Sequence, residues 1–98
     1  MNSFYLRRKE FDEAINVLKK FEKKEAHLMA RASTNLSFLY FLEGDYINAE
    51  KYSDIAIKND RYNSKALVNK GNTLFINGDL DRAKEIYLEV YWCISQIV

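Results

Sequence analysis

The chain has 98 residues, of which 48% are hydrophobic and 30% are charged, with three glycines and no proline. The 15 Lys and Arg side chains nearly balance the 14 Asp and Glu side chains, so the net charge is +1. This balance gives no general electrostatic footprint for nucleic acid or a membrane surface. Charged or polar residues also interrupt every apolar run before it reaches membrane-spanning length, which excludes direct membrane insertion by a helix.

The N-terminal segment and the single cysteine indicate the compartment. Residues 1–9 show no apolar core followed by a small-residue cleavage site, as a secretory signal would. Cys93 is the only cysteine, so it has no partner for an internal disulfide and cannot form a metal cluster alone. We therefore expect a reducing compartment, on the cytoplasmic side of membranes.

The first predicted element is a helix that begins near Phe11, with the small residue Ala14 at the point where a neighbouring helix would cross. Lys9–Glu10 stands where a turn is expected before this helix, and one extra residue near Lys24–His27 separates it from the next helix. Only eight residues precede the expected turn. We therefore expect residues 1–29 to hold the end of one helix and the whole of a second, so that the chain begins inside a structural unit.

Four further helices are predicted downstream, in two pairs. The turn within each pair is Gly44-Asp45 or Gly78-Asp79, because glycine ends a helix by adopting a positive φ and aspartate caps the next helix. Asn63 or Ser64 can cap the third of these helices in the same way. The expected ranges are 28–43, 46–58, 64–77 and 80–95.

The two helix pairs repeat with a period of 34 residues. On this period identical residues coincide at Ala32/Ala66, Asn35/Asn69, Gly44/Gly78, Asp45/Asp79 and Ala49/Ala83. A 34-residue helix–turn–helix period is that of tetratricopeptide (TPR) repeats. The sequence therefore predicts an all-α fold, in which about two and a half TPR repeats form a right-handed superhelical solenoid. We expect full repeats at 30–63 and 64–98, the second with an apolar C-terminal extension.

Small residues mark the positions where paired helices approach each other closely. The first helices of the two pairs offer Ser37 and Gly71 at equivalent places, and alanines occur on the second helices. Larger side chains are expected to fill the space beside them. The predicted packing residues are Ala14, Ser37, Gly71, Ala49, Ala56, Ala83, Tyr40, Leu74 and Tyr87.

The first helices of successive TPR hairpins line a concave groove, and helical spacing predicts which side chains face it. These are Arg31, Thr34, Phe38, Phe41, Leu42, Lys65, Val68, Asn72, Phe75 and Ile76. An apolar and aromatic groove with a basic residue at one edge suits an amphipathic helix or an apolar segment of a partner. Alternatively, the residues of the last turns only seal neighbouring helices together, because aromatic stripes at helical spacing are usually core. Phe38 and Asn72 are the stronger candidates for partner contact.

Four tracts, in this order, carry a more specific resemblance: SFYLRRKEFD (3–12), TNLSFLY (34–40), DRYN (60–63) and NKGNT (69–73). From about Ser3 to Val90 the chain resembles the polaris-type TPR subunits of intraflagellar transport complex B. After Val90 it departs from the family and reads YWCISQIV. The apolar character of this segment leads us to expect either that further chain or a partner covers it, or that Tyr91 and Ile94 pack on the preceding helices and the last residues fray.

The resemblance implies a structural role. Complex B assembles into trains that motors move along the axoneme, and cilia need it to form. Membership implies no catalytic residues and no cofactor, other core subunits of the complex as partners, and a location in the cilium or flagellum and the basal body.

A generic TPR adaptor, such as a co-chaperone that binds peptide tails, is the alternative. Clamping an acidic C-terminal tail needs paired lysine and asparagine side chains in the groove. Lys65 and Asn69 fit this pattern loosely. Thr34 and Phe38 occupy places where a cation and an amide would be needed, so the clamp is incomplete and a desolvated carboxylate would be costly.

An enzyme is the third class, and the sequence disfavours it. No nucleophile beside a base, no phosphate-binding loop and no paired carboxylates in a marked cleft emerge. Residues 19–25 mix lysine with glutamate, which is typical of a solvated helix face. His27 has no companion at metal-ligand spacing, so we expect no metal site.

Overall fold

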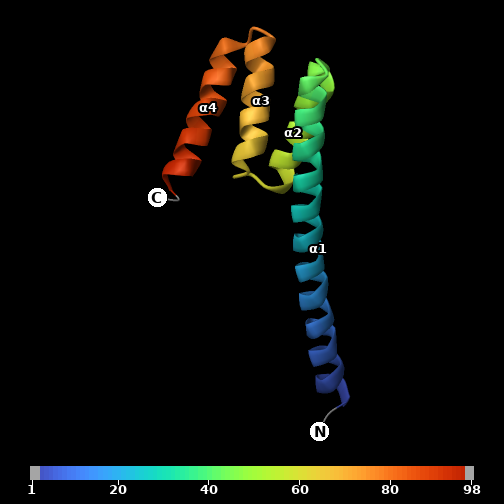
Figure 1. Cartoon of the computed structure of the whole chain (residues 1–98). Coiled ribbons are helices and arrows are strands. Elements are labelled where there is room, and N and C mark those ends of the chain that lie inside the picture. Colours follow the sequence, from blue (N-terminus) through green and yellow to red (C-terminus); the bar gives the residue numbers. More distant parts are fainter. Residues whose placement is uncertain (1–2, 97–98) are drawn as a thin grey trace.

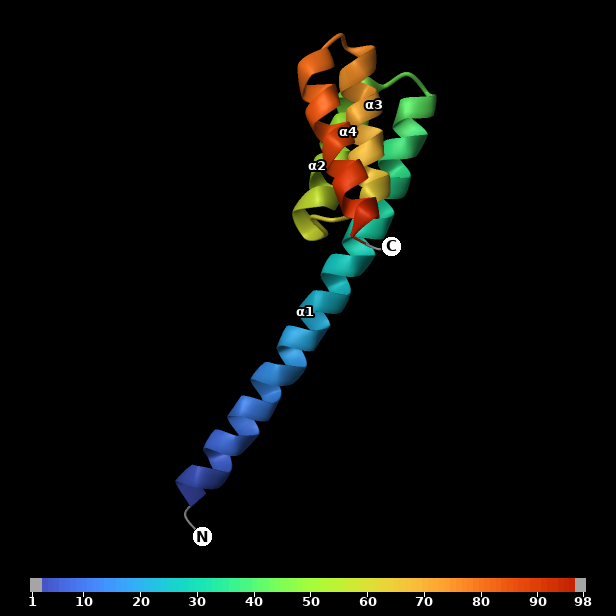
Figure 2. The ribbon, with the colours of Figure 1, turned by 90° about the vertical axis from the view of Figure 1, so that its left-hand side faces the viewer.

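The computed structural model describes residues 3–96. Four helices make up this range, and no strand occurs within it: α1 (Ser3–Leu42), α2 (Tyr46–Asn59), α3 (Ser64–Ile76) and α4 (Leu80–Ser95) (Figure 1). Successive helices pack as hairpins, with α1 and α3 toward one side and α2 and α4 toward the other (Figure 2). The predicted all-α class is confirmed.

The turns within the two hairpins have the predicted chemistry. Gly44 and Gly78 adopt φ values of 81° and 84°, the left-handed conformation that glycine reaches without strain. The Asp45 side chain then accepts a hydrogen bond from the backbone N–H of Asn48 at the start of α2, at 3.2 Å. Asp79 caps α4 in the same way. The same two-residue signal therefore ends one helix and starts the next in both hairpins.

The core is built mostly from small side chains, which lets the helix backbones approach closely. At the α1–α2 crossing the Ser37 hydroxyl is fully buried and donates a hydrogen bond to the carbonyl oxygen of Ala49, at 2.8 Å. Beside this contact the rings of Tyr40 and Tyr52 stack, with centroids 5.5 Å apart. The buried hydrophobic residues are Ala30, Ala49, Ala56, Ala66, Leu67, Leu74 and Ala83.

The α3–α4 crossing depends on one glycine. A Cβ atom added to Gly71 would lie 2.6 Å from Cε1 of Tyr87 and 2.9 Å from its Cδ1, far inside van der Waals contact. The Tyr87 hydroxyl donates a hydrogen bond to Oδ1 of Asn72, at 2.6 Å, which holds the ring over the glycine. Ser37 and Gly71 lie at equivalent crossings of the two hairpins. Ser37 forms a hydrogen bond across its crossing, whereas Gly71 leaves room for the ring of Tyr87.

The N-terminal third of the chain corrects the sequence analysis. In place of a turn at Lys9–Glu10 and a break near Lys24–His27, α1 runs without interruption from Ser3 to Leu42. No glycine or proline occurs in this range, so nothing in the local sequence stops the helix. Ala14, predicted as a packing residue, is exposed because no second helix lies against it.

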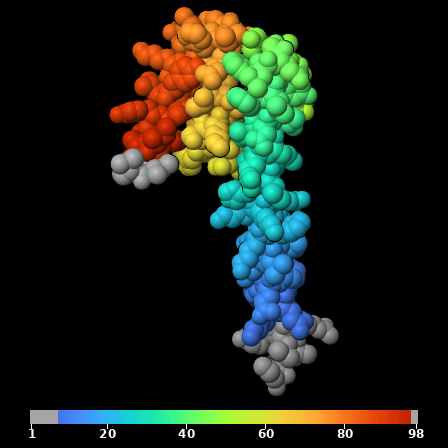
Figure 3. Space-filling view, viewed as in Figure 1, coloured from blue at the N-terminus to red at the C-terminus, as the bar shows by residue number. Residues whose placement is uncertain are grey.

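The resulting molecule is elongated, measuring 67 × 30 × 19 Å with a radius of gyration of 19.0 Å. A compact domain of this length would have a radius of gyration of about 13 Å. The difference comes from α1, whose N-terminal half projects from the other helices as a single rod (Figure 3). We call residues 8–25 the arm, and residues 26–96 the body. Every arm residue is exposed except Ile15, which is half-buried.

Candidate protein-binding face

Part of the predicted groove is an exposed apolar surface on α1 and α3. Phe38 is 50% exposed and Leu42 is 64% exposed, both on the last turns of α1. On α3 the equivalent last turn exposes Phe75 (56%) and Ile76 (51%). These residues belong to the groove that the sequence predicts, so we take the two helix ends as the candidate face, although Phe75 also borders a hollow with residues of α4. We call these four residues the apolar face.

Basic side chains flank the apolar face. Arg31 lies two helical turns before Phe38 on α1 and is exposed, and Lys65 is exposed in the first turn of α3. Both therefore lie nearer the open ends of the hairpins than the apolar residues do. The exposed apolar residues and these two exposed basic residues therefore lie on the same two helices.

The sequence predicts that Thr34 faces the groove, and the structure corrects this. Its side chain is 6% exposed, because it lies at the junction of α1 with α3. The hydroxyl donates to the carbonyl oxygen of Ala30 at 2.7 Å and accepts from Nδ2 of Asn63 at 3.1 Å. A threonine hydroxyl that is occupied on both sides in this way joins two elements of the fold and is not available to a partner.

Two asparagines complete this polar junction. Asn63 caps α3 through Oδ1, which accepts from the backbone N–H of Ala66 at 3.2 Å, while its Nδ2 reaches Thr34. The buried Asn69 donates through Nδ2 to the backbone carbonyl of Thr34, at 3.3 Å. Sequence reasoning predicted the cap but missed the junction. The 34-residue identity of Asn35 and Asn69 gives no signal for it, because Asn35 is exposed and Asn69 is buried.

The remaining groove candidates are partly used within the fold. Phe41 is half-buried, and its ring meets the edge of Tyr46 with centroids 5.5 Å apart. Val68 is half-buried on α3. Asn72 is half-buried, and its side-chain oxygen accepts the bond from Tyr87. These residues border the apolar face, but their side chains already contribute to packing.

The predicted packing residues divide by burial. Tyr40 and Tyr87 are half-buried, and Ala14 is exposed. The others lie in the crossings between helices, with Lys70 and Asp54 forming an ion pair of 2.6 Å between α3 and α2 beside them. The buried members are Ser37, Ala49, Ala56, Gly71, Leu74 and Ala83.

A second apolar region extends along α4. Leu80, Leu88 and Tyr91 are each more than half exposed, and together with Phe75 they border a shallow hollow of about 430 Å³. Trp92 is 55% exposed. Together with Tyr62 it borders another hollow, of about 310 Å³, at the C-terminal end of α4. This C-terminal segment is unusually apolar in sequence, and its side chains Tyr91 and Trp92 are exposed.

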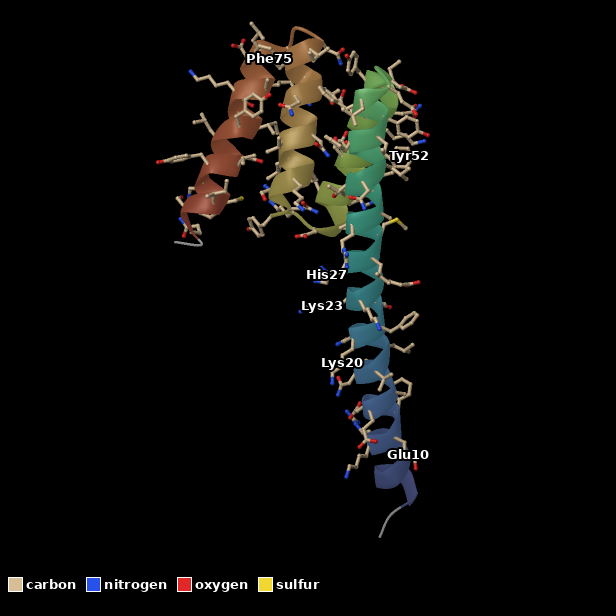
Figure 4. All side chains as sticks on the ribbon, in the orientation of Figure 1. Glu10, Lys20, Lys23, His27, Tyr52 and Phe75 are labelled. Carbon is tan, nitrogen blue, oxygen red and sulfur yellow. The ribbon has the colours of Figure 1, made fainter. Side chains whose placement is uncertain are left out.

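The charged and titratable residues singled out in the sequence lie apart from the apolar face. Lys20, Lys23 and His27 point from one side of α1, whereas Glu10 lies on the other (Figure 4). His27 is exposed. Across the described part of the chain no group of three His, Cys, Asp or Glu side chains could hold a metal ion. None of the helices within residues 3–96 is long and apolar enough to cross a membrane.

Comparison with known proteins supports the fold and the resemblance. Residues 64–91, which include α3 and most of α4, match the family described as "Tetratricopeptide repeat". The chain is 49% identical over 59 residues to "Intraflagellar transport protein 88 homolog" of Homo sapiens, a match that covers 60% of this chain and 7% of the relative. The TPR fold and the resemblance to an intraflagellar transport protein are confirmed. The chain spans a small part of that relative's length.

Proposed function

We propose that this chain is a non-catalytic TPR scaffold that binds other proteins through the apolar face, as part of the intraflagellar transport B particle. The observation that carries the proposal is the exposure of large apolar side chains on both helices, Phe38 and Leu42 on α1 and Phe75 and Ile76 on α3, each at least half exposed. The similarity to an intraflagellar transport protein, over a helical scaffold fold, supports the assignment to that machinery.

The face fits an apolar or amphipathic helical segment of the partner. Phe38 and Phe75 offer aromatic surface from two different helices, and aromatic side chains dominate the energy of such contacts. An amphipathic helix would place apolar residues at i, i+3, i+4 and i+7 against them. Acidic residues at one end of that helix would meet Arg31 and Lys65, which would fix its direction.

The partners we propose are other core subunits of the same complex. The scaffold would work in the cilium or flagellum and at the basal body, on the cytoplasmic side of the membrane, in cilium assembly and intraciliary transport. It would need no cofactor, because its contribution is binding surface.

The alternative, a generic adaptor for acidic peptide tails, gains no support from the polar groups of α3. Asn69 would have to offer its amide to a carboxylate, but it is 9% exposed and donates to the backbone of Thr34. Releasing that amide would leave a buried carbonyl without its partner, at a cost of about 1–3 kcal/mol. Lys65 alone offers no paired, charge-assisted clamp.

A quantitative pull-down from ciliated-cell lysate tests the proposal, with bound proteins identified by mass spectrometry. We expect the chain to enrich complex B subunits and Phe38→Ala to lower that enrichment about fivefold or more, because one anchor of an interface commonly contributes over 1 kcal/mol. Ile47→Ala is the matched control, since Ile47 is 85% exposed on α2 and is not one of the four residues of the apolar face. Circular dichroism establishes that both variants keep their helicity.

Enrichment of chaperones alone, in a salt-sensitive manner and through acidic C-terminal peptides, would replace the proposal with the adaptor function. Equal loss of binding in Phe38→Ala and Ile47→Ala would show that the contact lies elsewhere on the molecule.

A further inference from the structure

The arm carries an apolar stripe that is mostly exposed to solvent. Phe11, Leu18 and Phe21 are 65%, 59% and 58% exposed, and Ala14 and Ile15 lie between them. At 100° per residue these five side chains fall within one third of the helix circumference. Figure 4 shows Lys20 and Lys23 pointing to the side of α1 that faces α3 and α4, and the same helical geometry places the stripe on the side away from them.

The stripe has the spacing of a helix-pairing seam. Phe11 and Leu18 are seven residues apart, and Ala14 and Phe21 follow each of them by three, which is the a and d pattern of a heptad repeat. With this register Glu10 and Lys24 fall on one flank of the seam, at g positions. Arg8 and Glu22 fall on the other flank, at e positions.

These flanking charges match a second copy of the same arm in antiparallel orientation. Placing Phe11 opposite Phe21 of the second copy also places Ala14 opposite Leu18, so each of the two inner layers pairs a large side chain with a small one. The same alignment sets Glu10 opposite Lys24 of the second copy. It also sets Arg8 opposite Glu22, and two-fold symmetry repeats each ion pair.

A parallel pairing has no such match. Glu25 occupies the next a position, where a parallel partner would bring the two Glu25 carboxylates together in the seam. The flanking contacts would then join Glu10 to Ile15 and Glu22 to Val17, with no ion pair. Like charges in a partly desolvated seam are unfavourable, so the sequence specifies the antiparallel arrangement over the parallel one.

We propose that two copies of this chain pair through their arms, antiparallel and in this register. The overlap covers residues 8–24, about 26 Å of helix. Residue 26 of each copy lies beyond residue 8, where the other copy's overlap ends. Within each copy Glu22 and Glu25 border a hollow together with Lys58 and Asn59 of α2, so the body approaches the overlap at this end. The interface is smaller than a standard protein–protein interface, so we expect a dissociation constant on the order of tens of micromolar.

Charge reversal tests both the partner and the register, with association of the full chain measured by sedimentation velocity over a concentration series at low salt. Lys24→Glu converts both Glu10 contacts to repulsion and should raise the dissociation constant about tenfold, as should Glu10→Lys. An equimolar mixture of the two single variants should associate about as tightly as the parent chain, because a dimer of one copy of each variant again has opposite charges at both contacts.

Lys20→Glu is the matched control, because it makes the same change in net charge on the opposite side of the arm. It should leave the dissociation constant within about twofold of the parent's, since screened charges outside the seam contribute little. Recovery in the mixture cannot come from a helix folding back within one chain. The test does not depend on the proposed partners of the apolar face.

A chain that sediments as a monomer at several hundred micromolar would overturn the proposal. So would a mixture that stays as weakly associated as its components, or a control that weakens association as much as Lys24→Glu does.

Discussion

Gly71 lies under the ring of Tyr87, where no Cβ atom fits. A larger side chain there must push α4 away from α3 or turn the ring out of its hydrogen bond with Asn72. We expect Gly71→Leu to lower the free energy of unfolding by about 1–3 kcal/mol or more through overpacking. For a chain of this length each kcal/mol corresponds to about 4–8 °C in the melting temperature, which calorimetry would measure.

The tyrosine ring supplies the control for this prediction. In a Tyr87→Ala background the clash is absent, so Gly71→Ala should be neutral or stabilising by up to about 1 kcal/mol through helix propensity. If Gly71→Ala changed stability equally in both backgrounds, the close contact would not be the reason that glycine is needed.

The junction of α1 with α3 depends on Asn63, which both caps α3 and bonds to Thr34. Asn63→Ser keeps a capping oxygen but is too short to reach Thr34, whereas Asn63→Ala removes both interactions. We expect a loss of about 1–2 kcal/mol for the alanine variant and roughly half of that for the serine variant. Urea denaturation followed by far-UV circular dichroism measures both values.

Two results would contradict this account of the junction. A serine variant as stable as the parent would mean that the bond to Thr34 contributes nothing. Equal losses in the serine and alanine variants would mean that the cap contributes nothing.

Helix ends in the C-terminal two thirds of the chain were predictable because residues with a single conformational role mark them. Gly44 and Gly78 adopt positive φ, and Asp45 and Asp79 cap the helices that follow, so the predicted and observed bounds differ by one residue or none at every end marked in this way. The start of α1 carries no such mark. Lys9–Glu10 is predicted as a turn only because it takes the place of Gly44-Asp45 when Ala14 is aligned with Ala49.

Burial within a helix was less predictable than helix ends. The repeat pattern places Thr34 and Val68 at equivalent groove positions, yet Thr34 is buried under two asparagines and Val68 is half-buried. The cause is contact between hairpins, since α3 packs against α1 and covers Thr34, whereas within residues 3–96 no later hairpin packs against α3 in the same way. The sequence repeat predicts the structure of one hairpin, but it does not predict which neighbouring hairpins pack against it.

At the scale of the whole molecule, the arm and the body should respond separately to a break in α1. Lys23 is exposed, so Lys23→Pro removes no tertiary contact but disrupts the helix, at a cost of about 3 kcal/mol. The residues before it would form an isolated helix of about 20 residues, which is marginal in water. We expect far-UV ellipticity to fall by about a fifth while the melting temperature of the body changes by less than about 2 °C.

Lys23→Ala is the control, because it removes the same side chain and favours the helix. Small-angle scattering of this variant in dilute solution should give the radius of gyration of 19.0 Å found here. A body that melts well below the parent in Lys23→Pro would show that the arm supports it.

The continuity of α1 also sets a distance and a direction. Phe11 in the arm and Phe38 on the apolar face are 27 residues apart, which corresponds to about 40 Å along the axis and seven and a half turns. The two side chains therefore point in opposite directions from one rigid spacer. One residue inserted between them would add only about 1.5 Å to the span but would turn one binding surface by about 100° relative to the other.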